Sequence, residues 1–326
     1  MARLTMVQAL DQALLQEMER DPKVVVLGED VGRDGGVFRV TEGLVERFGE
    51  DRVIDTPLAE SGIAGFSIGL AIAGYRPVAE MQFSGFSYPA YDQMISHASR
   101  MRRRSQGRWT VPMVLRAPYG GGIRALEHHS ESMEAIWAHV PGLKVVIPSD
   151  PYDAKGLLTA AIRDPDPVVF YEPKRVYRAI KMEVPEEQYE VPLGRTKVVR
   201  EGRDVTLITW GAHVRTCKGA AEELAADGRA EAEVVDVRTL TPFDFEGVMA
   251  SVRKTGRAVV VSEEPPTASF AAEVVAQVAE RAILHLEAPP RRVTGFDIPP
   301  PLAKLEDWYQ PDVDLVVAET LRALEF

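Results

Sequence analysis

The chain has 326 residues, 45% of them hydrophobic, with a formal net charge of −11 and one cysteine. This length allows a large buried core and two domains. The acidic balance argues against nucleic acid and against an anionic membrane as partners. A single cysteine excludes an intramolecular disulfide, and asparagine is absent from the sequence.

The N-terminal segment is expected to form an amphipathic helix that is capped at Thr5 and ends before Pro22. It has too few consecutive apolar residues for a signal peptide and too many acidic residues for a transit peptide. No apolar run approaches the roughly 18 residues that a membrane-spanning helix needs. We therefore expect a cytoplasmic protein without membrane segments.

Short apolar runs alternate with helical stretches or glycine-rich loops along the first half of the chain. This alternation predicts an α/β domain with a mostly parallel sheet and helices on both faces. The predicted strands are Val24–Leu27, Arg52–Asp55, Pro77–Phe83, Val111–Arg116, Lys144–Pro148 and Pro167–Tyr171.

The segment from Ala179 to Pro192 loses this periodicity and gains proline and acidic residues, as linkers do. A second alternating series follows it and closes with a helix at Asp312–Leu324. We therefore predict two tandem α/β domains, 1–180 and 193–326, joined by a linker at 181–192. The strands predicted in the second domain are Val205–Trp210, Ala232–Val237, Ala258–Ser262 and Arg292–Phe296.

The segment DTPLAESGIAG, which begins at Asp55, leads from a predicted strand into a helix of small and apolar residues. Glu60 falls at the start of this helix, where the macrodipole and the free N–H groups favour a carboxylate for structural reasons alone. Gly62, Gly65 and Gly69 weaken the helix by about 1 kcal/mol each relative to alanine. Because the helix has almost no polar face, we expect it to be buried in the core or against a second subunit.

A second segment of chemical interest opens with three glycines, Gly120 to Gly122, and delivers two adjacent histidines, His128 and His129. Ligand sites of open α/β sheets lie at such strand ends, and glycine permits close approach of the backbone. Histidine titrates near neutrality, which suits catalysis. Capping of the helix predicted at Ser132–Val140 and a subunit contact are equally compatible with the spacing. Zinc is disfavoured, because Cys217 is distant in sequence and has no CxxC or HxxxH partner.

Several motifs keep a recognisable order and spacing over about the whole chain. They are LGEDVG (27–32), GGVF (35–38), DTPLAE (55–60), YDQ (91–93), HHSES (128–132), PGLKVV (141–146), DAKGLL (153–158), AIRDPDPVVF (161–170) and DVRTLTPFD (236–244). Together they resemble the β chain of thiamine-diphosphate-dependent 2-oxo acid dehydrogenases, the E1 components of pyruvate, branched-chain 2-oxo acid and acetoin complexes.

The resemblance implies a transketolase-like pyrimidine-binding domain followed by a transketolase C-terminal-like domain. It implies that thiamine diphosphate binds between this chain and an α chain, which holds the diphosphate and Mg²⁺ through a GDG motif ending in asparagine. This sequence has neither GDG nor asparagine. The Mg²⁺ site is therefore expected on the α subunit of an α₂β₂ heterotetramer, with a lipoyl-bearing E2 acyltransferase and a small 2-oxo acid as further partners.

The same resemblance assigns roles to individual residues. Glu60 matches the glutamate that hydrogen-bonds N1′ of the aminopyrimidine and so promotes loss of the C2 proton. Leu58 and Phe86 match positions that pack on the pyrimidine, and Gln82 lies nearby. Many relatives carry tyrosine in place of Phe86, so the stacking face is kept and a hydroxyl contact is lost. His129 matches the histidine of an HSQS motif, implied to supply a proton near C2 and the incoming lipoyl group.

Two departures from the family pattern affect this assignment. Glu131 replaces a glutamine and His128 is also unusual, and the added carboxylate is expected to raise the pKa of the neighbouring histidine. The segment AIRDPDP matches a structural K⁺ loop, although an ordinary turn at a helix end explains it as well. The implied ligands are Met113, Ala161, Ile162, Asp164 and Asp166, the last standing where relatives often have asparagine.

The function implied is that of an E1 β subunit, which takes part in oxidative decarboxylation of a 2-oxo acid and reductive acylation of lipoyl-E2. A self-sufficient transketolase-type enzyme is the first alternative, and the missing diphosphate motif argues against it. The second alternative is a non-catalytic scaffold subunit, against which the presence of Glu60 and His129 argues. The identity of the 2-oxo acid does not follow from the sequence.

Overall fold

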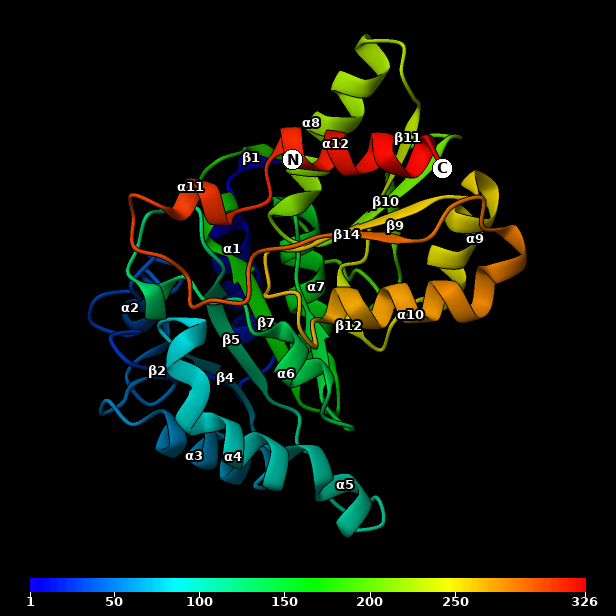
Figure 1. Ribbon diagram of the computed structural model, residues 1–326. Coiled ribbons are helices and arrows are strands. Elements are labelled where there is room, and N and C mark those ends of the chain that lie inside the picture. Colours follow the sequence, from blue (N-terminus) through cyan, green and yellow to red (C-terminus); the bar gives the residue numbers. More distant parts are fainter. The chain divides into compact units, whose positions relative to one another are not determined.

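The computed structural model describes residues 1–326, which pack as two compact units (Figure 1). The first unit contains Met1–Tyr119 and Ile136–Leu193. The second contains Gly120–Ala135 and Gly194–Phe326, so the segment with the glycines and histidines packs with the C-terminal part of the chain. The domain boundaries at 180 and 193 stay a prediction.

A parallel sheet with strand order β6-β7-β5-β4-β2-β3 organises the first unit, which confirms the predicted parallel arrangement. One strand is displaced from its prediction, because β5 begins at Val114 rather than Val111 and continues through Pro118. Beyond Arg116 the strand pairs with β7 alone, and a strand paired on one side tolerates proline. The strands are β2 (Val24–Gly28), β3 (Val53–Asp55), β4 (Arg76–Glu80), β5 (Val114–Tyr119), β6 (Lys144–Val146) and β7 (Val168–Pro173).

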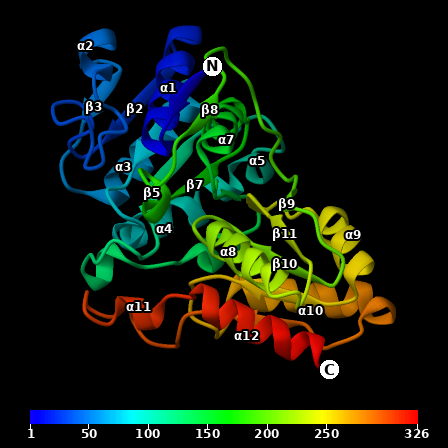
Figure 2. The same cartoon turned by 90° about the horizontal axis from the view of Figure 1, so that it is seen from above.

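Helix α1 (Met6–Arg20) begins where the sequence predicts, because Thr5 and Gln8 form a reciprocal capping box at its N-terminus. It packs against α7 (Pro151–Arg163), and Figure 2 shows the two helices side by side. A second pair is formed by α3 (Glu60–Ile72) and α4 (Tyr88–Ser96). The remaining helices of this unit are α2 (Leu44–Phe48), α5 (Met101–Arg104) and α6 (Glu134–Ala138, shared with the second unit).

The first unit also holds the predicted linker against its own surface. Strand β1 (Ala2–Leu4) pairs antiparallel with β8 (Met182–Val184), and both are too short to show a periodic pattern. The ammonium group of Lys155 then binds the carbonyl oxygens of residues 185, 186 and 187 at 2.6, 3.2 and 2.9 Å. The chain that follows β8 is therefore tied to α7.

The second unit is built on a sheet with strand order β14-β13-β10-β11-β9, parallel except for β9. In Figure 1, α8 and α12 lie on one side of this sheet, and α9 and α10 lie on the other. Cys217 is buried in the core between the sheet and α8, and burial raises the pKa of its thiol to about 12. The strands of this sheet are β9 (Lys197–Arg200), β10 (Val205–Thr209), β11 (Ala232–Asp236), β13 (Ala258–Val261) and β14 (Arg291–Val293). The unit also contains the short strand β12 (Thr239–Thr241), which is not part of this sheet.

Three helices of the second unit, α9, α10 and α12, begin at side-chain caps. Asp244, Ser269 and Asp312 each accept a backbone N–H of the helix that follows, which satisfies a donor that the helix leaves open. The helices are α8 (His213–Ala226), α9 (Phe245–Thr255), α10 (Phe270–Ala282), α11 (Glu306–Tyr309) and α12 (Val313–Leu324). None of the helices in the chain has the length and apolar character that a membrane crossing requires.

Candidate functional site

The carboxyl ends of β2, β3 and β4 bring three motif segments of the first unit together. The carboxylate of Asp55, at the end of β3, accepts the N–H groups of Gly32 and Arg33 at 2.6 and 3.0 Å. The amide of Gln82, just after β4, donates to the carboxylate of Asp30 at 3.0 Å. Because all three strands are parallel, this edge of the sheet is where a ligand site is expected.

Glu60 is the first residue of α3 and is partly buried. No side chain caps this helix, so the Glu60 carboxylate lies among free N–H groups at the positive end of the dipole. A second carboxyl, that of Glu29, lies close to it. Burial raises the pKa of Glu29, and the charge of Glu60 raises it further. We assigned Glu29 no role from the sequence, although its place directly after a buried strand marks it as a strand-end residue.

The predicted pyrimidine contacts lie at the same edge of the first unit. Phe86 is in the 3₁₀ turn η1 (Ser84–Ser87) that follows β4, and its ring packs edge-on against Phe83 with centroids 5.4 Å apart. Leu58, between β3 and α3, leaves 79% of its surface exposed. An exposed leucine, a partly buried aromatic ring and a carboxyl are the residue types that an aminopyrimidine needs: apolar contact for its faces and an acid for its nitrogen.

His129 belongs to the second unit, and so the structure places the two predicted catalytic residues in different units. It lies in the 3₁₀ turn η3 (Glu127–His129), ahead of α6. Helix α6 is shorter than the predicted Ser132–Val140 and begins at Glu134. The Glu131 carboxylate lies 3.1 Å from Nδ1 of His128, so the added carboxylate of the HHSES motif contacts the first of the two histidines.

The residues predicted to bind K⁺ lie at the end of α7, where the chain itself provides positive charge. A guanidinium nitrogen of Arg76 lies 2.9 Å from the carbonyl oxygen of Ile162 and 3.4 Å from that of Asp164. The Lys144 ammonium contacts both carboxylate oxygens of Asp164, and Arg102 binds Asp166 at 2.6 Å.

The carbonyls of the other two predicted ligands, Met113 and Ala161, accept backbone N–H groups. The alternative of an ordinary helix-end turn therefore accounts for these contacts without an ion. Nowhere in the chain do three or more His, Cys, Asp or Glu side chains gather as metal ligands.

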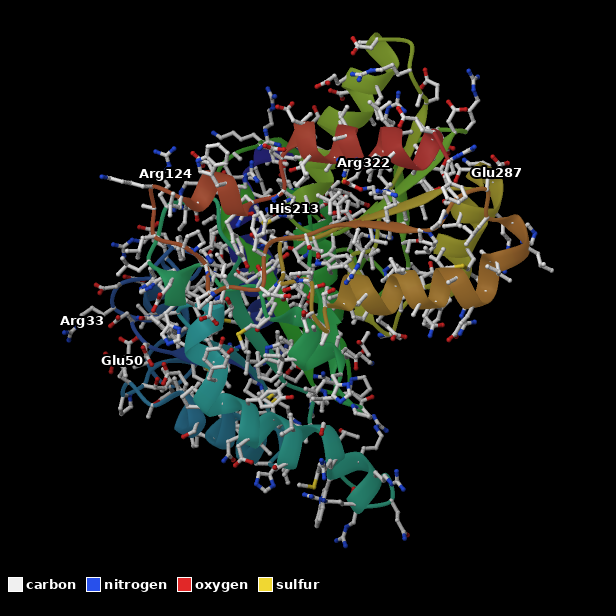
Figure 3. All side chains as sticks on the ribbon, in the orientation of Figure 1. Arg33, Glu50, Arg124, His213, Glu287 and Arg322 are labelled. Carbon is white, nitrogen blue, oxygen red and sulfur yellow. The ribbon has the colours of Figure 1, made fainter.

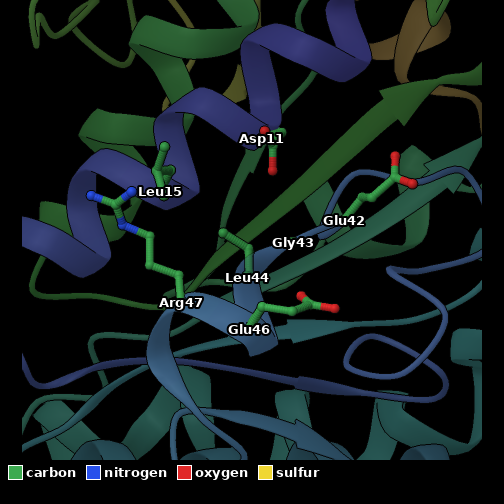
Figure 4. Close-up of a pocket in the computed structure, with 7 residues that line it drawn as sticks. All are labelled: Asp11, Leu15, Glu42, Gly43, Leu44, Glu46 and Arg47. Carbon is green, nitrogen blue, oxygen red and sulfur yellow. The ribbon is translucent and has the colours of Figure 1, made fainter.

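A separate cavity of about 380 Å³ lies between α1 and α2 (Figure 4). Asp11 and Glu42 place two carboxylates at its wall, and burial raises the pKa of Asp11 to about 6. The cavity contains none of the predicted cofactor-binding residues. It is lined by Asp11, Leu15, Glu42, Gly43, Leu44, Glu46 and Arg47.

Comparison with known proteins first defines the class. Residues 2–180 match the family model described as transketolase, pyrimidine binding domain, and residues 194–316 match transketolase, C-terminal domain. A solved structure titled "Split gene transketolase, inactive beta4 tetramer" has the same fold, with a TM-score of 0.81, 23% identity and 99% of each chain covered. The chain is thus a two-domain transketolase-type protein, as its predicted fold class stated.

Curated relatives then narrow the class. A protein of Acholeplasma laidlawii named pyruvate dehydrogenase E1 component subunit beta is 54% identical over 318 residues, which cover 98% of this chain and 97% of that protein. The protein of the same name from Bacillus subtilis (strain 168) is 52% identical over 326 residues and 100% of both chains. This chain therefore belongs to the family of β subunits of 2-oxo acid dehydrogenase E1 components, which confirms the predicted family.

Proposed function

We propose that this chain forms, with an α subunit, an α₂β₂ E1 that decarboxylates pyruvate and transfers the acyl group to a lipoyl-bearing E2. One observation carries the proposal: Glu60 begins α3 at the strand edge where Gln82 and Phe86 also lie. The name of the relatives at 50–54% identity supports pyruvate among the possible 2-oxo acids.

The residues present fit an aminopyrimidine. One oxygen of the Glu29 carboxyl is buried and has no hydrogen-bond partner in the chain, and the charge of Glu60 acts on this carboxyl. Leu58 and Phe86 would contact the ring, and Glu60 would hold a proton at its N1′ nitrogen. When bound, thiamine diphosphate supplies the carbon nucleophile and the electron sink that decarboxylation of a 2-oxo acid requires. The part of this chain is to orient the ring and to keep the N1′ proton in place.

His129 is proposed to supply a proton close to the reacting carbon and to the lipoyl group. Its imidazole suits both tasks, because a histidine exchanges a proton readily near neutral pH. The proposal for His129 rests on its place in the HHSES motif of the second unit.

The exposed face of α3 supports the expectation of an α subunit. This helix buries Ile63, Ile68 and Ala71 within the chain. Its other face remains exposed, with Phe66 at 54% and Ile72 at 37%, so the helix is not wholly buried in the core. An apolar helix face of this kind is typical of a subunit contact. We propose that the α subunit covers it and contributes the diphosphate and Mg²⁺ site.

The first test removes the carboxyl at the start of α3. Glu60→Ala is expected to lower decarboxylation by about 10²- to 10⁴-fold, because a positioned proton-transfer group contributes that much. The measurement is 2-oxo acid decarboxylation with an artificial electron acceptor, in E1 assembled with its α subunit. Glu46→Ala, which removes an exposed first-turn glutamate of α2, is the control. An assembled Glu60→Ala enzyme with full activity would contradict the assignment.

The second test separates the two half-reactions. His129→Ala is expected to reduce lipoyl-dependent acyl transfer more than decarboxylation with an artificial acceptor, because only the former needs a proton for the lipoyl sulfur. His285→Ala changes an exposed histidine of the second unit and is expected to affect neither reaction. Equal losses in both assays after His129→Ala would reject this division of labour.

We further propose that a K⁺ ion at the end of α7 would compete with Arg76 and Lys144 for the oxygen atoms of Ile162 and Asp164. Because Arg76 already contacts the Ile162 carbonyl oxygen and Lys144 already neutralises the Asp164 carboxylate, the stabilisation by K⁺ is expected to be small. Melting temperatures in KCl and NaCl at equal ionic strength measure it. A rise specific to KCl supports a bound ion, and equal melting temperatures reject one.

A further inference from the structure

The loop that carries His129 is fastened to the second unit by two buried carboxylates that bind its backbone. Glu306, at the start of α11, accepts the N–H of Gly122 at 2.8 Å with one oxygen and the N–H of Arg124 at 2.6 Å with the other. Glu263, after β13, accepts the N–H of Gly121 at 2.9 Å. Both glutamates are only 3% exposed. Charge-assisted hydrogen bonds of this kind are about twice as strong as neutral ones.

The glycines of the loop are required for this contact. Gly120, Gly122 and Arg124 all have positive φ (77°, 88° and 56°), a backbone form in which successive N–H groups make a concave anion-binding nest. A Cβ atom on Gly120 would lie 2.1 Å from the carboxylate of Glu263, closer than any real contact. The absence of a side chain at Gly120 therefore lets the carboxylate of Glu263 come close to the loop backbone.

The two ends of the loop, Gly120 and Glu131, are also joined to one another. The N–H of Gly120 donates to the carbonyl oxygen of Glu131 at 3.1 Å, so the chain before and after the histidines is joined. Three residues further on, the indole N–H of Trp210 donates to Glu134 at 2.9 Å. His129 thus lies on a closed loop whose glycine end is held by Glu306 and Glu263.

We propose that Glu306 is a positioning residue for His129, which it holds through the backbone of Gly122 and Arg124. The proposal rests on the role given to His129 under the proposed function. Loss of the bidentate carboxylate would free the glycine end of the loop, and a shift of about 1 Å at a reacting group costs on the order of 10²-fold in rate.

The neighbouring residue provides a matched control. Asp307 binds the same Arg124, but through the guanidinium, at 2.9 Å and at the surface, where the two side chains are 73% and 67% exposed. Figure 3 shows Arg124 on the outside of the molecule beside α11. Such an exposed pair contributes little. Asp307→Asn therefore removes a charge from the same short helix while the backbone contacts of the loop remain.

The first measurement reports on the loop and does not depend on catalysis. In the assembled E1, Glu306→Gln is expected to increase amide hydrogen exchange across residues 120–131 by tenfold or more, since a donor amide replaces one acceptor oxygen. Trypsin cleavage after Arg124 is expected to accelerate in parallel. Asp307→Asn frees the Arg124 side chain but is expected to leave both rates near those of the wild type.

The second measurement compares the half-reactions. Glu306→Gln is expected to lower kcat of lipoyl-dependent acyl transfer by about 10- to 100-fold, with a smaller effect on artificial-acceptor decarboxylation and on KM for the 2-oxo acid. Glu306→Asp keeps the charge but shortens the side chain by one methylene group, so its loss should be intermediate. Asp307→Asn should match the wild type in both assays.

The outcomes separate this inference from the proposed function. Unchanged amide exchange in Glu306→Gln overturns the clamp itself. Faster exchange without a loss in acyl transfer, while His129→Ala shows that loss, overturns the positioning role and leaves the proposed function intact. If His129→Ala shows no loss specific to acyl transfer, the proposed role of His129 fails, and the positioning role of Glu306 fails with it.

Discussion

Each of the two units contains a cluster of buried carboxyl groups, and the clusters differ in one component. In the first unit, Glu80 and Glu172 share a buried arginine, Arg116. In the second unit, Glu134 and Glu264 are equally buried, but no cation is bound to either of them. The presence or absence of that cation decides the protonation state of each cluster.

The arginine network links three neighbouring parallel strands. Arg116 on β5 binds both oxygens of Glu172 on β7 at 2.7 and 2.8 Å and also contacts Glu80 on β4. Burial by itself would lower the pKa of Arg116, but the two carboxylates outweigh it and raise that pKa. Burial raises the pKa of Glu80, and the charge of Arg116 opposes part of this shift. The guanidinium is thus a bound counter-charge for the two buried carboxyl groups.

The carboxyl pair of the second unit has neutral donors only. Glu134 accepts from the indole of Trp210, and Glu264 accepts from the Ala271 N–H and from the Ser262 hydroxyl. One oxygen of each carboxyl has no partner. Burial, together with the charge of Glu264, raises the pKa of Glu134 well above its usual range. Burial raises the pKa of Glu264 to about 7, although the charge of Arg292 opposes the shift. Carboxyls buried without a bound cation are therefore partly protonated near neutral pH.

The largest effect is expected from removing the cation of the first cluster. Arg116→Met keeps an unbranched apolar stem but removes the guanidinium, and it leaves Glu80 and Glu172 buried without a counter-charge. The free energy of unfolding is expected to fall by about 3–5 kcal/mol, the range found for broken buried ion pairs. Urea unfolding of the assembled E1 at about pH 8 measures it.

The pH dependence sharpens this first prediction. Without Arg116 the effect of burial on Glu80 is unopposed and the pKa of this carboxyl rises further in the folded state, so the deficit should shrink as the pH falls toward about 5 and Glu80 takes up a proton. Arg229→Met, which breaks a half-exposed surface pair with Glu223 and Asp227, is the control and should cost about 1 kcal/mol or less. A cost for Arg116→Met no larger than that of the control would contradict the account.

A smaller effect of opposite sign is expected in the second cluster. The pKa of Glu264 is raised from its ordinary 4.5 to about 7, so the folded state binds the extra proton. The stability this provides is complete below about pH 4.5 and is lost as the pH rises through about 7. Glu264→Gln keeps an acceptor for Ala271 and cannot ionise. It should stabilise the protein at about pH 8 by on the order of 2–3 kcal/mol.

The control for this change is Glu273→Gln, which alters an exposed glutamate on α10. It should leave the pH dependence of unfolding as it is in the wild type, whereas Glu264→Gln should flatten that dependence between about pH 5 and 8. A flat wild-type profile over this interval would show that Glu264 is already ionised in the folded protein.

The sequence predicted the elements whose residues repeat with a clear period. The parallel sheet of the first half, the alternating α/β series of the second half and the Thr5 cap are confirmed, because apolar alternation and capping chemistry are local properties. The prediction missed β1, β8, β9 and β12, since strands this short form only when a distant segment supplies their partners. It also ended one strand before Pro118, because the sequence does not show on which side a strand lacks a neighbour.

In the candidate site, too, local sequence patterns predicted some residues and missed others. Motifs identified Glu60 and His129 as candidates, and strand ends predicted where the first of them lies. The carboxylates that hold the histidine loop, Glu263 and Glu306, follow His129 by more than a hundred residues in the sequence. No local pattern connects a glycine backbone with acids so far away. The pairing exists only after the second unit has folded, which is why sequence reasoning did not find it.

The smallest effect is expected from removing one neutral hydrogen-bond donor from each cluster. The hydroxyl of Tyr177 donates at 2.5 Å to Glu172, which also binds the Arg116 guanidinium, and the hydroxyl of Ser262 donates at 3.3 Å to Glu264, which binds no cation. A hydrogen bond to a charged group contributes about 1.5–3 kcal/mol, and one to a neutral group about 0.5–1.5 kcal/mol. Tyr177→Phe should therefore destabilise the protein by about 2 kcal/mol, and Ser262→Ala by about 1 kcal/mol or less.

These two variants also differ in their response to pH, which urea unfolding at about pH 6 and 8.5 measures. The cost of Ser262→Ala should grow across this interval, because Glu264 loses its proton and the donor then meets a charge. The cost of Tyr177→Phe should change less across this interval, because the Arg116 guanidinium stays bound to Glu172 at both pH values. Equal costs that do not change with pH would mean that both clusters have the same charge, and the contrast between the two units would then be wrong.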